Sequence, residues 1–199
     1  MAEHYFSQQP QSNSSPKTWN FNLKEKLYTF TSDHGVFSKN TVDYGTRLLT
    51  EAFEVPVQSG SLLDLGCGYG PIGICLADHF PDRQVVMADI NERALQLAKQ
   101  NAALNHVENI ELKKSDRFTN LAADQFAAIL TNPPIRAGKK TVHAIFEESY
   151  PALAGQGELW VVMQKKQGAP SAKEKLKAVF GNVTIIARSK GYYILRSKK

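Results

Sequence analysis

A glycine-rich loop contains the first residues that could do chemistry. It reads DLGCGYGPIG over residues 64–73, after the apolar run SLLDL and before a helical pattern. Gly66, Gly68 and Gly70 would let the backbone turn tightly and approach a ligand without a side chain in the way. The spacing also fits a dinucleotide-binding motif. However, the Asp64 carboxylate would repel a pyrophosphate and attract a sulfonium or ammonium group, so the loop favours a cationic cofactor that carries an amino acid.

Acidic residues also follow the next two apolar runs. Asp89 ends the run VVMAD roughly 20 residues after the loop, where a carboxylate can accept hydrogen bonds from ribose hydroxyls. Asp116 follows the next run, beside Arg117, and is placed to contact an adenine amino group. Capping of the helices that follow is the alternative role for both carboxylates.

A pair of prolines predicts a rigid corner after the apolar run FAAILT. Because Pro133 and Pro134 cannot donate to a sheet, the strand must end at Asn132, at the edge where ligands bind in open α/β sheets. The side-chain oxygen of Asn132 and the carbonyl of Pro133 could accept both hydrogens of an amine and point its lone pair at a methyl carbon. We therefore predict that Asn132, Pro133 and Pro134 form the catalytic corner of an enzyme that methylates an amino nitrogen, without a catalytic histidine.

Strand and helix patterns alternate around these motifs. The predicted strands are 61–65, 84–89, 109–116, 126–132 and 157–163. The predicted helices are 71–80, 92–105, 140–153 and 172–180. A hairpin of 183–188 and 192–197 is expected to follow. This alternation predicts a parallel sheet with helices on both faces.

The region before the sheet has its own pattern. Residues 1–16 are polar and are expected to be flexible. Alternating apolar residues predict a strand or hairpin over residues 18–30, and Ser38 or Asn40 could cap a helix through TVDYGTRLLTEAF. We therefore expect a single domain over 17–199, with an N-terminal cap and helix at 17–55 and the cofactor-binding sheet at 60–199.

Composition limits the classes of partner. The chain has 199 residues, 42% of them hydrophobic, which suits one domain with its own core. A net charge of +5 permits a polyanionic partner. The two cysteines, Cys67 and Cys75, do not form a metal-ligand pattern and are interpreted as packing residues. No run approaches the roughly 20 apolar residues that span a bilayer, so we expect a cytoplasmic protein without metal or membrane association.

Three motifs together resemble class I S-adenosylmethionine-dependent methyltransferases. They are DLGCGYGPIG, ADIN at 88–91 and NPPI at 132–135. More narrowly, GVFSKNTVDYGTRLL at 35–49 and NPPIRAGKK at 132–140 are similar to the small-methyltransferase group that contains the RsmC-type ribosomal RNA guanine-N2 methyltransferases, in particular to its short, single-domain form.

This resemblance covers nearly the whole chain and implies both a fold and a cofactor. The implied fold is α/β and Rossmann-like, with a seven-stranded, mostly parallel sheet, an antiparallel C-terminal hairpin and helices on both faces. The implied cofactor is S-adenosylmethionine. The resemblance, with the flanking residues of each motif, makes the cofactor pocket Asp64, Gly66, Gly68, Gly70, Asp89, Ile90, Asn91, Asp116, Arg117 and Asn132.

The resemblance also implies ribosomal RNA or the small ribosomal subunit as the partner. Ile135 and Arg136 stand where RsmC-type enzymes typically have Phe followed by His, a departure that bears on base specificity. Arg136 and Phe37 are the candidates for capturing the base, and Ile135 is a further candidate substrate contact. The candidate contacts to the RNA backbone are Lys139, Lys140, Lys165 and Lys166.

Other functions remain open at this point. An Asn-Pro-Pro corner orients any planar amide or amine, which fits a protein-glutamine or small-molecule amine methyltransferase. The missing aromatic residue after the corner fits a non-catalytic accessory protein that binds S-adenosylmethionine or RNA, whereas the complete cofactor pocket favours an enzyme. The sequence gives no indication of the oligomeric state.

Overall fold

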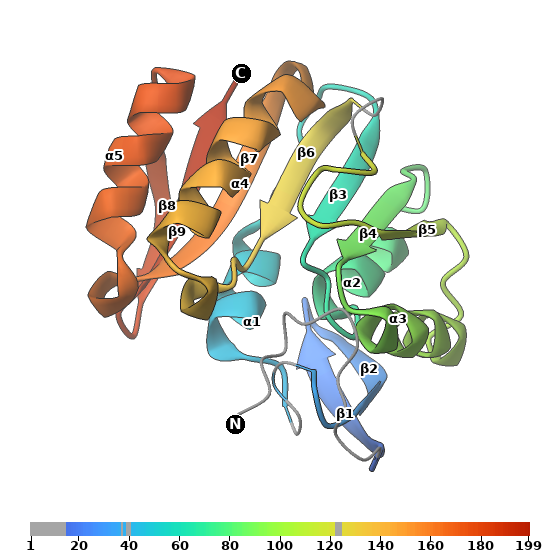
Figure 1. Cartoon of the computed structure of the whole chain (residues 1–199). Coiled ribbons are helices and arrows are strands. Elements are labelled where there is room, and N and C mark those ends of the chain that lie inside the picture. Colours follow the sequence, from blue (N-terminus) through green and yellow to red (C-terminus); the bar gives the residue numbers. More distant parts are fainter. Residues whose placement is uncertain (1–14, 37, 39–40, 122–124) are drawn as a thin grey trace.

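A seven-stranded sheet forms the centre of the protein, whose computed structural model describes residues 15–36, 38, 41–121 and 125–199 (Figure 1). The strands are β3 (Ser61–Leu65), β4 (Val85–Asp89), β5 (Ile110–Lys114), β6 (Phe126–Thr131), β7 (Leu153–Gln164), β8 (Thr184–Ser189) and β9 (Tyr192–Lys198). Their order across the sheet is β5-β4-β3-β6-β7-β9-β8. The pairs from β5 to β7 are parallel, and β9 is antiparallel to both of its neighbours. The predicted fold class, including the C-terminal hairpin, is confirmed.

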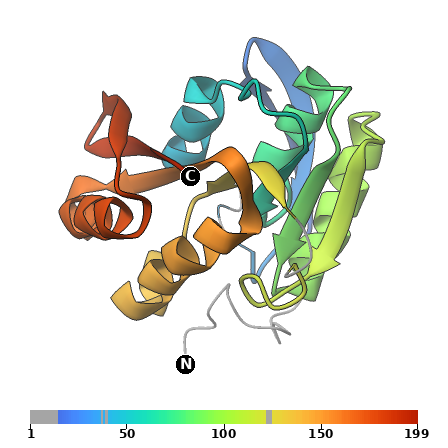
Figure 2. The same ribbon diagram turned by 90° about the horizontal axis from the view of Figure 1, so that it is seen from above.

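Helices cover both faces of this sheet, as predicted (Figure 2). They are α1 (Tyr44–Ala52), α2 (Pro71–His79), α3 (Glu92–Leu104), α4 (Lys139–Ala152) and α5 (Ala169–Phe180), with short 3-10 helices η1 (Ile135–Ala137) and η2 (Lys165–Gln167). Because side chains alternate along a strand, Leu62 packs with α1, α2 and α3, whereas Leu63 packs with α4 and α5. The central strands β3, β4 and β6 are therefore buried on both sides, which explains their nearly continuous apolar sequences.

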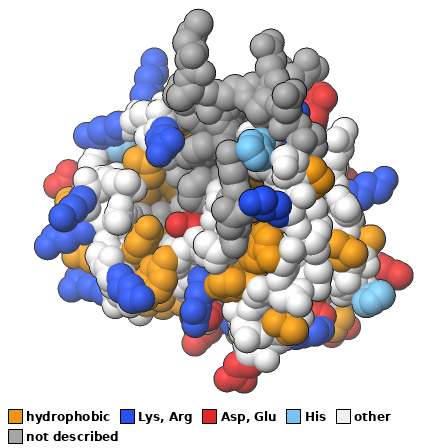
Figure 3. Space-filling model, turned by 90° about the horizontal axis from the view of Figure 1, so that it is seen from below, with side chains coloured by type: hydrophobic (Ala, Val, Ile, Leu, Met, Phe, Trp, Pro, Cys, Tyr) orange, Lys and Arg blue, Asp and Glu red, His pale blue; other side chains and the backbone are white. Residues whose placement is uncertain are grey.

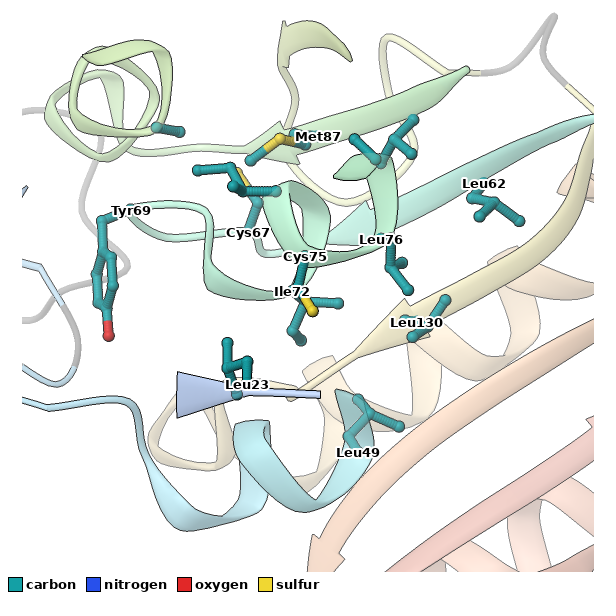
Figure 4. Close-up of a cluster of buried hydrophobic side chains, with 14 of the residues drawn as sticks. Leu23, Leu49, Leu62, Cys67, Tyr69, Ile72, Cys75, Leu76, Met87 and Leu130 are labelled. Carbon is teal, nitrogen blue, oxygen red and sulfur yellow. The ribbon is translucent and has the colours of Figure 1, made fainter. Parts of the chain in front are cut away.

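The first of these two cores contains both cysteines. Cys67 and Cys75 are free and buried, and they lie among Ile72, Leu76 and Met87 (Figure 4). Burial raises the pKa of the Cys75 thiol to about 11. The interpretation of the cysteines as packing residues is confirmed.

The region before the sheet, predicted to be a strand or a hairpin, is a hairpin. It consists of β1 (Lys17–Leu23) and β2 (Lys26–Ser32). The amide of Asn101 on α3 accepts from Thr31 N at 2.7 Å and donates to Thr31 O at 2.9 Å, and Asn105 makes the same pair of bonds with Thr29. Asn101 also donates to Tyr69 O at 2.8 Å. These amides satisfy the edge of β2 and join the hairpin to the glycine-rich loop.

The cap of α1 differs from the prediction. Asp43 caps the helix, and its carboxylate accepts from Gly45 N at 2.9 Å and from Thr46 N at 3.2 Å. Ser38 does not cap, because its hydroxyl donates to the carbonyl of Thr41, and Asn40 lies outside the described residues. Aspartate caps a helix as well as serine or asparagine does, so the cap could move to the residue next to the first helical turn.

Within the part of the chain that the structure describes, no helix is both long enough and apolar enough to cross a membrane. The same residues contain no group of three or more His, Cys, Asp or Glu side chains that could hold a metal ion.

Candidate cofactor and substrate site

A cavity of about 420 Å³ opens at the carboxyl edge of the sheet, between the ends of β3, β4, β5 and β6 and the start of α1. This volume lies in the range of pockets that bind small molecules. The cavity brings together nine of the predicted site residues: Gly66, Gly68, Asp89, Ile90, Asp116, Arg117, Asn132, Pro133 and Pro134. Side chains that the sequence analysis did not select complete it, among them Asp43, Thr46, Ser115 and Thr141.

The glycines of the loop have different roles. Gly66 and Gly68 have φ angles of 74° and 56°, and a Cβ on either would meet no atom within 4 Å. They therefore leave open space beside the cavity. Gly70 has a φ of 97°, but a Cβ there would lie 2.7 Å from Met87 Cε and 2.9 Å from Ile74 Cδ1. Gly70 does not line the cavity, and its small size serves the packing of α2.

Asp64 lies beneath the loop and does not line the cavity. It is fully buried, and its Oδ2 accepts from Gly73 N at 2.8 Å. No described residue donates to its Oδ1. Burial, reinforced by the charge of Asp89, raises the pKa of Asp64 to about 7. The carboxylate therefore supports the loop from below and adds negative potential under the cavity when it is ionised.

Asp89 joins the loop to the start of α3. Its Oδ2 accepts from Gly68 N at 2.9 Å and its Oδ1 from Asn91 N at 2.8 Å. Burial raises the pKa of Asp89 despite these bonds. Asn91 caps α3 by accepting from Arg93 N and Ala94 N, and it is almost completely buried. The capping role therefore belongs to Asn91, while Asp89 and Ile90 face the cavity.

Asp116 and Arg117 form the part of the wall that follows β5. Arg117 Nε donates to both carboxylate oxygens of Glu148 at 3.0 and 3.1 Å, and its guanidinium lies 3.5 Å from Asp116 Oδ1. Glu148 comes from α4, so the positive charge of Arg117 is paired outside the cavity. Asp43, Asp89 and Asp116 therefore give the lining a negative balance.

The Asn132 amide has a defined orientation. Its Nδ2 donates to Thr46 Oγ1 at 2.9 Å and to Asp43 Oδ2 at 3.2 Å, so both of its hydrogens have acceptors on α1 or at its cap. No described residue donates to Asn132 Oδ1, which leaves this oxygen able to accept from a ligand. The sequence analysis missed Asp43 and Thr46, because no local pattern connects residues that lie 89 and 86 positions from Asn132.

The predicted substrate residues lie at the rim, not in the lining. Ile135 packs against the α4–α5 core, and Arg136, Lys139 and Lys140 are exposed. Other residues of the same segment, Ala137, Thr141 and Ile145, line the cavity instead. Phe37 lies outside the described residues. Contact of these residues with a substrate stays a prediction.

Comparison with known proteins assigns the family. Residues 27–196 match the family described as Methyltransferase small domain. The chain belongs to the methyltransferase small-domain family. The predicted membership of this group is confirmed.

Two sequence relatives show how the family varies in length. This methyltransferase small-domain chain is 56% identical over 200 residues to YbxB of Bacillus subtilis (strain 168), and the match covers 100% of both chains. It is 30% identical over 167 residues to Ribosomal RNA small subunit methyltransferase C of Hamiltonella defensa, which covers 82% of this chain and 48% of the relative. The chain therefore spans all of YbxB but about half of this second relative.

Solved structures share the fold. The 16S rRNA N2 methyltransferase RsmC of T. thermophilus, in complex with AdoMet and guanosine, matches with a TM-score of 0.82 and 24% identity. The match covers 92% of this chain and 50% of RsmC. A methyltransferase from Pyrococcus furiosus matches with a TM-score of 0.65 and 19% identity over 76% of this chain. The methyltransferase small-domain chain thus shares its fold with these proteins.

Proposed function

We propose that this protein transfers the methyl group of S-adenosylmethionine to the exocyclic N2 of a guanine in ribosomal RNA. The observation that carries this proposal is the fixed amide of Asn132, which presents an acceptor oxygen at the edge of a negatively lined cavity. Family membership and the named activity of the RsmC relatives support the same reaction.

The residues of the cavity suit the cofactor. A molecule with a sulfonium and an ammonium group is attracted by the carboxylates of Asp43, Asp89 and Asp116, because opposite charges gain most where water is partly excluded. Gly66 and Gly68 leave room for the ligand beside the loop. Asp89 is the candidate for holding the ribose hydroxyls, since it stands at the end of β4. The bound cofactor supplies an electrophilic methyl carbon.

The Asn-Pro-Pro corner would orient the target amine. With both N–H groups of Asn132 held by Asp43 and Thr46, its Oδ1 would accept one hydrogen of the guanine amine. The Pro133 carbonyl is the candidate acceptor for the second hydrogen, and the rigid prolines preorganise both acceptors. Two accepted hydrogens turn the nitrogen lone pair out of the base plane. The chain then acts by orientation, without a general base before attack.

Replacing Asn132 with alanine tests this role. Asn132→Ala should abolish methylation of ribosomal RNA while cofactor affinity, measured by calorimetry, stays within roughly tenfold of wild type. Asp89→Ala is the contrasting variant, since it should weaken cofactor binding first. Retained turnover in Asn132→Ala would contradict the orienting role.

A further inference from the structure

The turn between β8 and β9 lies at the same edge of the sheet as the cavity. Gln164, the last residue of β7, pairs with Tyr192, the first residue of β9. Because β7 is parallel to β6, this pairing puts residues 189–191 at the carboxyl end of the sheet. Lys165 N donates to Gly191 O at 2.7 Å and connects the turn to the end of β7.

Two tyrosine rings meet at this edge, next to the cavity. Tyr44 follows Asp43, whose side chain lines the cavity, and its ring centre lies 5.6 Å from that of Tyr192 at an interplanar angle of 53°. The Tyr44 hydroxyl hydrogen-bonds with Ser189 Oγ at 2.7 Å. A Cβ on Gly45 would lie 2.9 Å from Tyr192 Cε1, so Tyr192 packs closely over the start of α1. Both rings are held in place, and both are partly exposed.

Lys and Arg side chains lie near these two rings. Lys190 Nζ lies 4.7 Å from the centre of the Tyr44 ring, and Lys190 is exposed. Residues 175–199 contain seven Lys or Arg and no Asp or Glu. Figure 3, which views this end of the molecule, shows Lys and Arg side chains gathered along its left side. The exposed cations at the ends of β6, β7 and β8 are Arg136, Lys139, Lys140, Lys165, Lys166 and Arg188.

We propose that Tyr44, Tyr192 and Lys190 form a docking surface for the single-stranded RNA nucleotides that flank the target guanine. Partly exposed aromatic rings beside a cation are how proteins hold unpaired bases and their phosphates. This docking surface begins at Tyr44, directly after Asp43, which lines the cavity. A nucleotide next to a base bound in the cavity would therefore contact the docking surface. The carboxylates of an acidic peptide would pair with the cations, but they would not stack on the two tyrosine rings. This inference rests on the proposed function.

Binding of a fluorescently labelled single-stranded RNA, followed by anisotropy at several salt concentrations, tests the surface. Lys190→Glu should weaken binding by about fivefold or more and reduce the salt slope by about 1. Tyr44→Leu and Tyr192→Leu should each weaken it by about five- to tenfold, since they remove a stacking ring. Lys198→Glu is the matched control, because it reverses the same charge on β9 at the opposite edge of the sheet.

The outcomes separate this surface from the proposed function. Equal effects of Lys190→Glu and Lys198→Glu would overturn the surface. A loss with Lys190→Glu but not with either Tyr variant, each checked for unchanged cofactor binding, would also overturn it, because it would reduce the contact to attraction between Lys190 and the RNA phosphates without stacked bases. A third outcome is that the variants show the expected losses of RNA binding while the wild-type protein methylates no RNA. That combination would support the docking surface and would contradict only the proposed function.

Discussion

Replacing Thr46 with valine removes one of the two acceptors that hold the Asn132 amide. Thr46 is buried, and its Oγ1 accepts from Asn132 Nδ2 at 2.9 Å. Valine keeps the shape and the helix propensity of threonine, and the backbone N–H of residue 46 can still donate to Asp43. The amide then keeps only its 3.2 Å bond to Asp43 and leaves one N–H without a partner. The perturbation therefore acts on the orientation of the Asn132 amide.

The expected magnitude follows from this single lost bond. A partly buried donor left unpaired costs about 1–2 kcal/mol. If that cost is felt in the transition state, kcat should fall by roughly five- to thirtyfold, since each 1.36 kcal/mol is tenfold in rate. The cofactor Kd should change little, because Thr46 acts on the amine-binding group. Steady-state methylation of RNA gives kcat, and calorimetry gives the cofactor Kd.

Two variants make this test specific. Thr46→Ser restores the hydroxyl and should recover most of the turnover. Thr50→Val is the matched control, because the buried Thr50 hydroxyl lies one turn further along α1 and donates to Thr46 O at 2.8 Å, not to the site. Wild-type kcat in Thr46→Val, or an equal loss in Thr50→Val, would refute the role of Thr46 in orienting Asn132.

Three further predictions concern the parts that support the site. Asn101→Ala leaves the N–H and C=O of Thr31 without their buried partners, so the free energy of unfolding should fall by about 3 kcal/mol or more, with faster hydrogen exchange in β2. Asp64 has a folded pKa of about 7 against an ordinary value of 3.8, so its ionisation costs stability as pH rises between these values. Asp64→Asn should therefore gain on the order of 3 kcal/mol relative to the ligand-free wild type between pH 5 and pH 8, measured by denaturant unfolding. Both Gly70→Ala and Gly66→Ala put a Cβ at a positive φ and should lower the melting temperature, but Gly70→Ala should lower it further because its Cβ would also collide with Met87, whereas Gly66→Ala, with open space around it, should also weaken cofactor binding.

Each of these has a result that would contradict it. Unchanged exchange in β2 would show that the Asn101 amide does not hold the hairpin. If the difference in unfolding free energy between Asp64→Asn and wild type did not change with pH, Asp64 would not ionise in this pH range in the folded protein. Equal melting temperatures for the two glycine variants would contradict the division of roles within the loop.

Local patterns predicted most of the fold and much of the cavity. Each strand of the sheet and each helix that covers it has its own spacing of apolar residues, so these elements could be recognised without knowing any distant contact. Gly68, Asp89 and Asn132 each stand at or just after the end of a parallel strand, and such strand ends meet at one edge. The prediction therefore brought these residues together without any knowledge of their distances.

What the sequence did not reveal depends on contacts between distant segments. Asp43 looked like one polar residue among several before a helix, and nothing near it indicated a bond to Asn132. Asn101 looked like an ordinary polar residue of α3. Its amide, however, makes the two backbone hydrogen bonds to Thr31 that a neighbouring strand would otherwise make to β2. Asp89 ends β4 and Asn91 follows it by two residues, and only the local backbone decides that Asp89 faces the cavity while Asn91 caps α3.

The identity of the methylated product tests the central claim most directly. Ribosomal RNA and small ribosomal subunits without the endogenous modification would be incubated with the protein and S-adenosylmethionine carrying a labelled methyl group, digested to nucleosides and analysed by mass spectrometry. The account predicts label in N2-methylguanosine with the wild-type protein and none with Asn132→Ala. Label in another nucleoside, in a protein glutamine or in no product, despite cofactor binding, would contradict it.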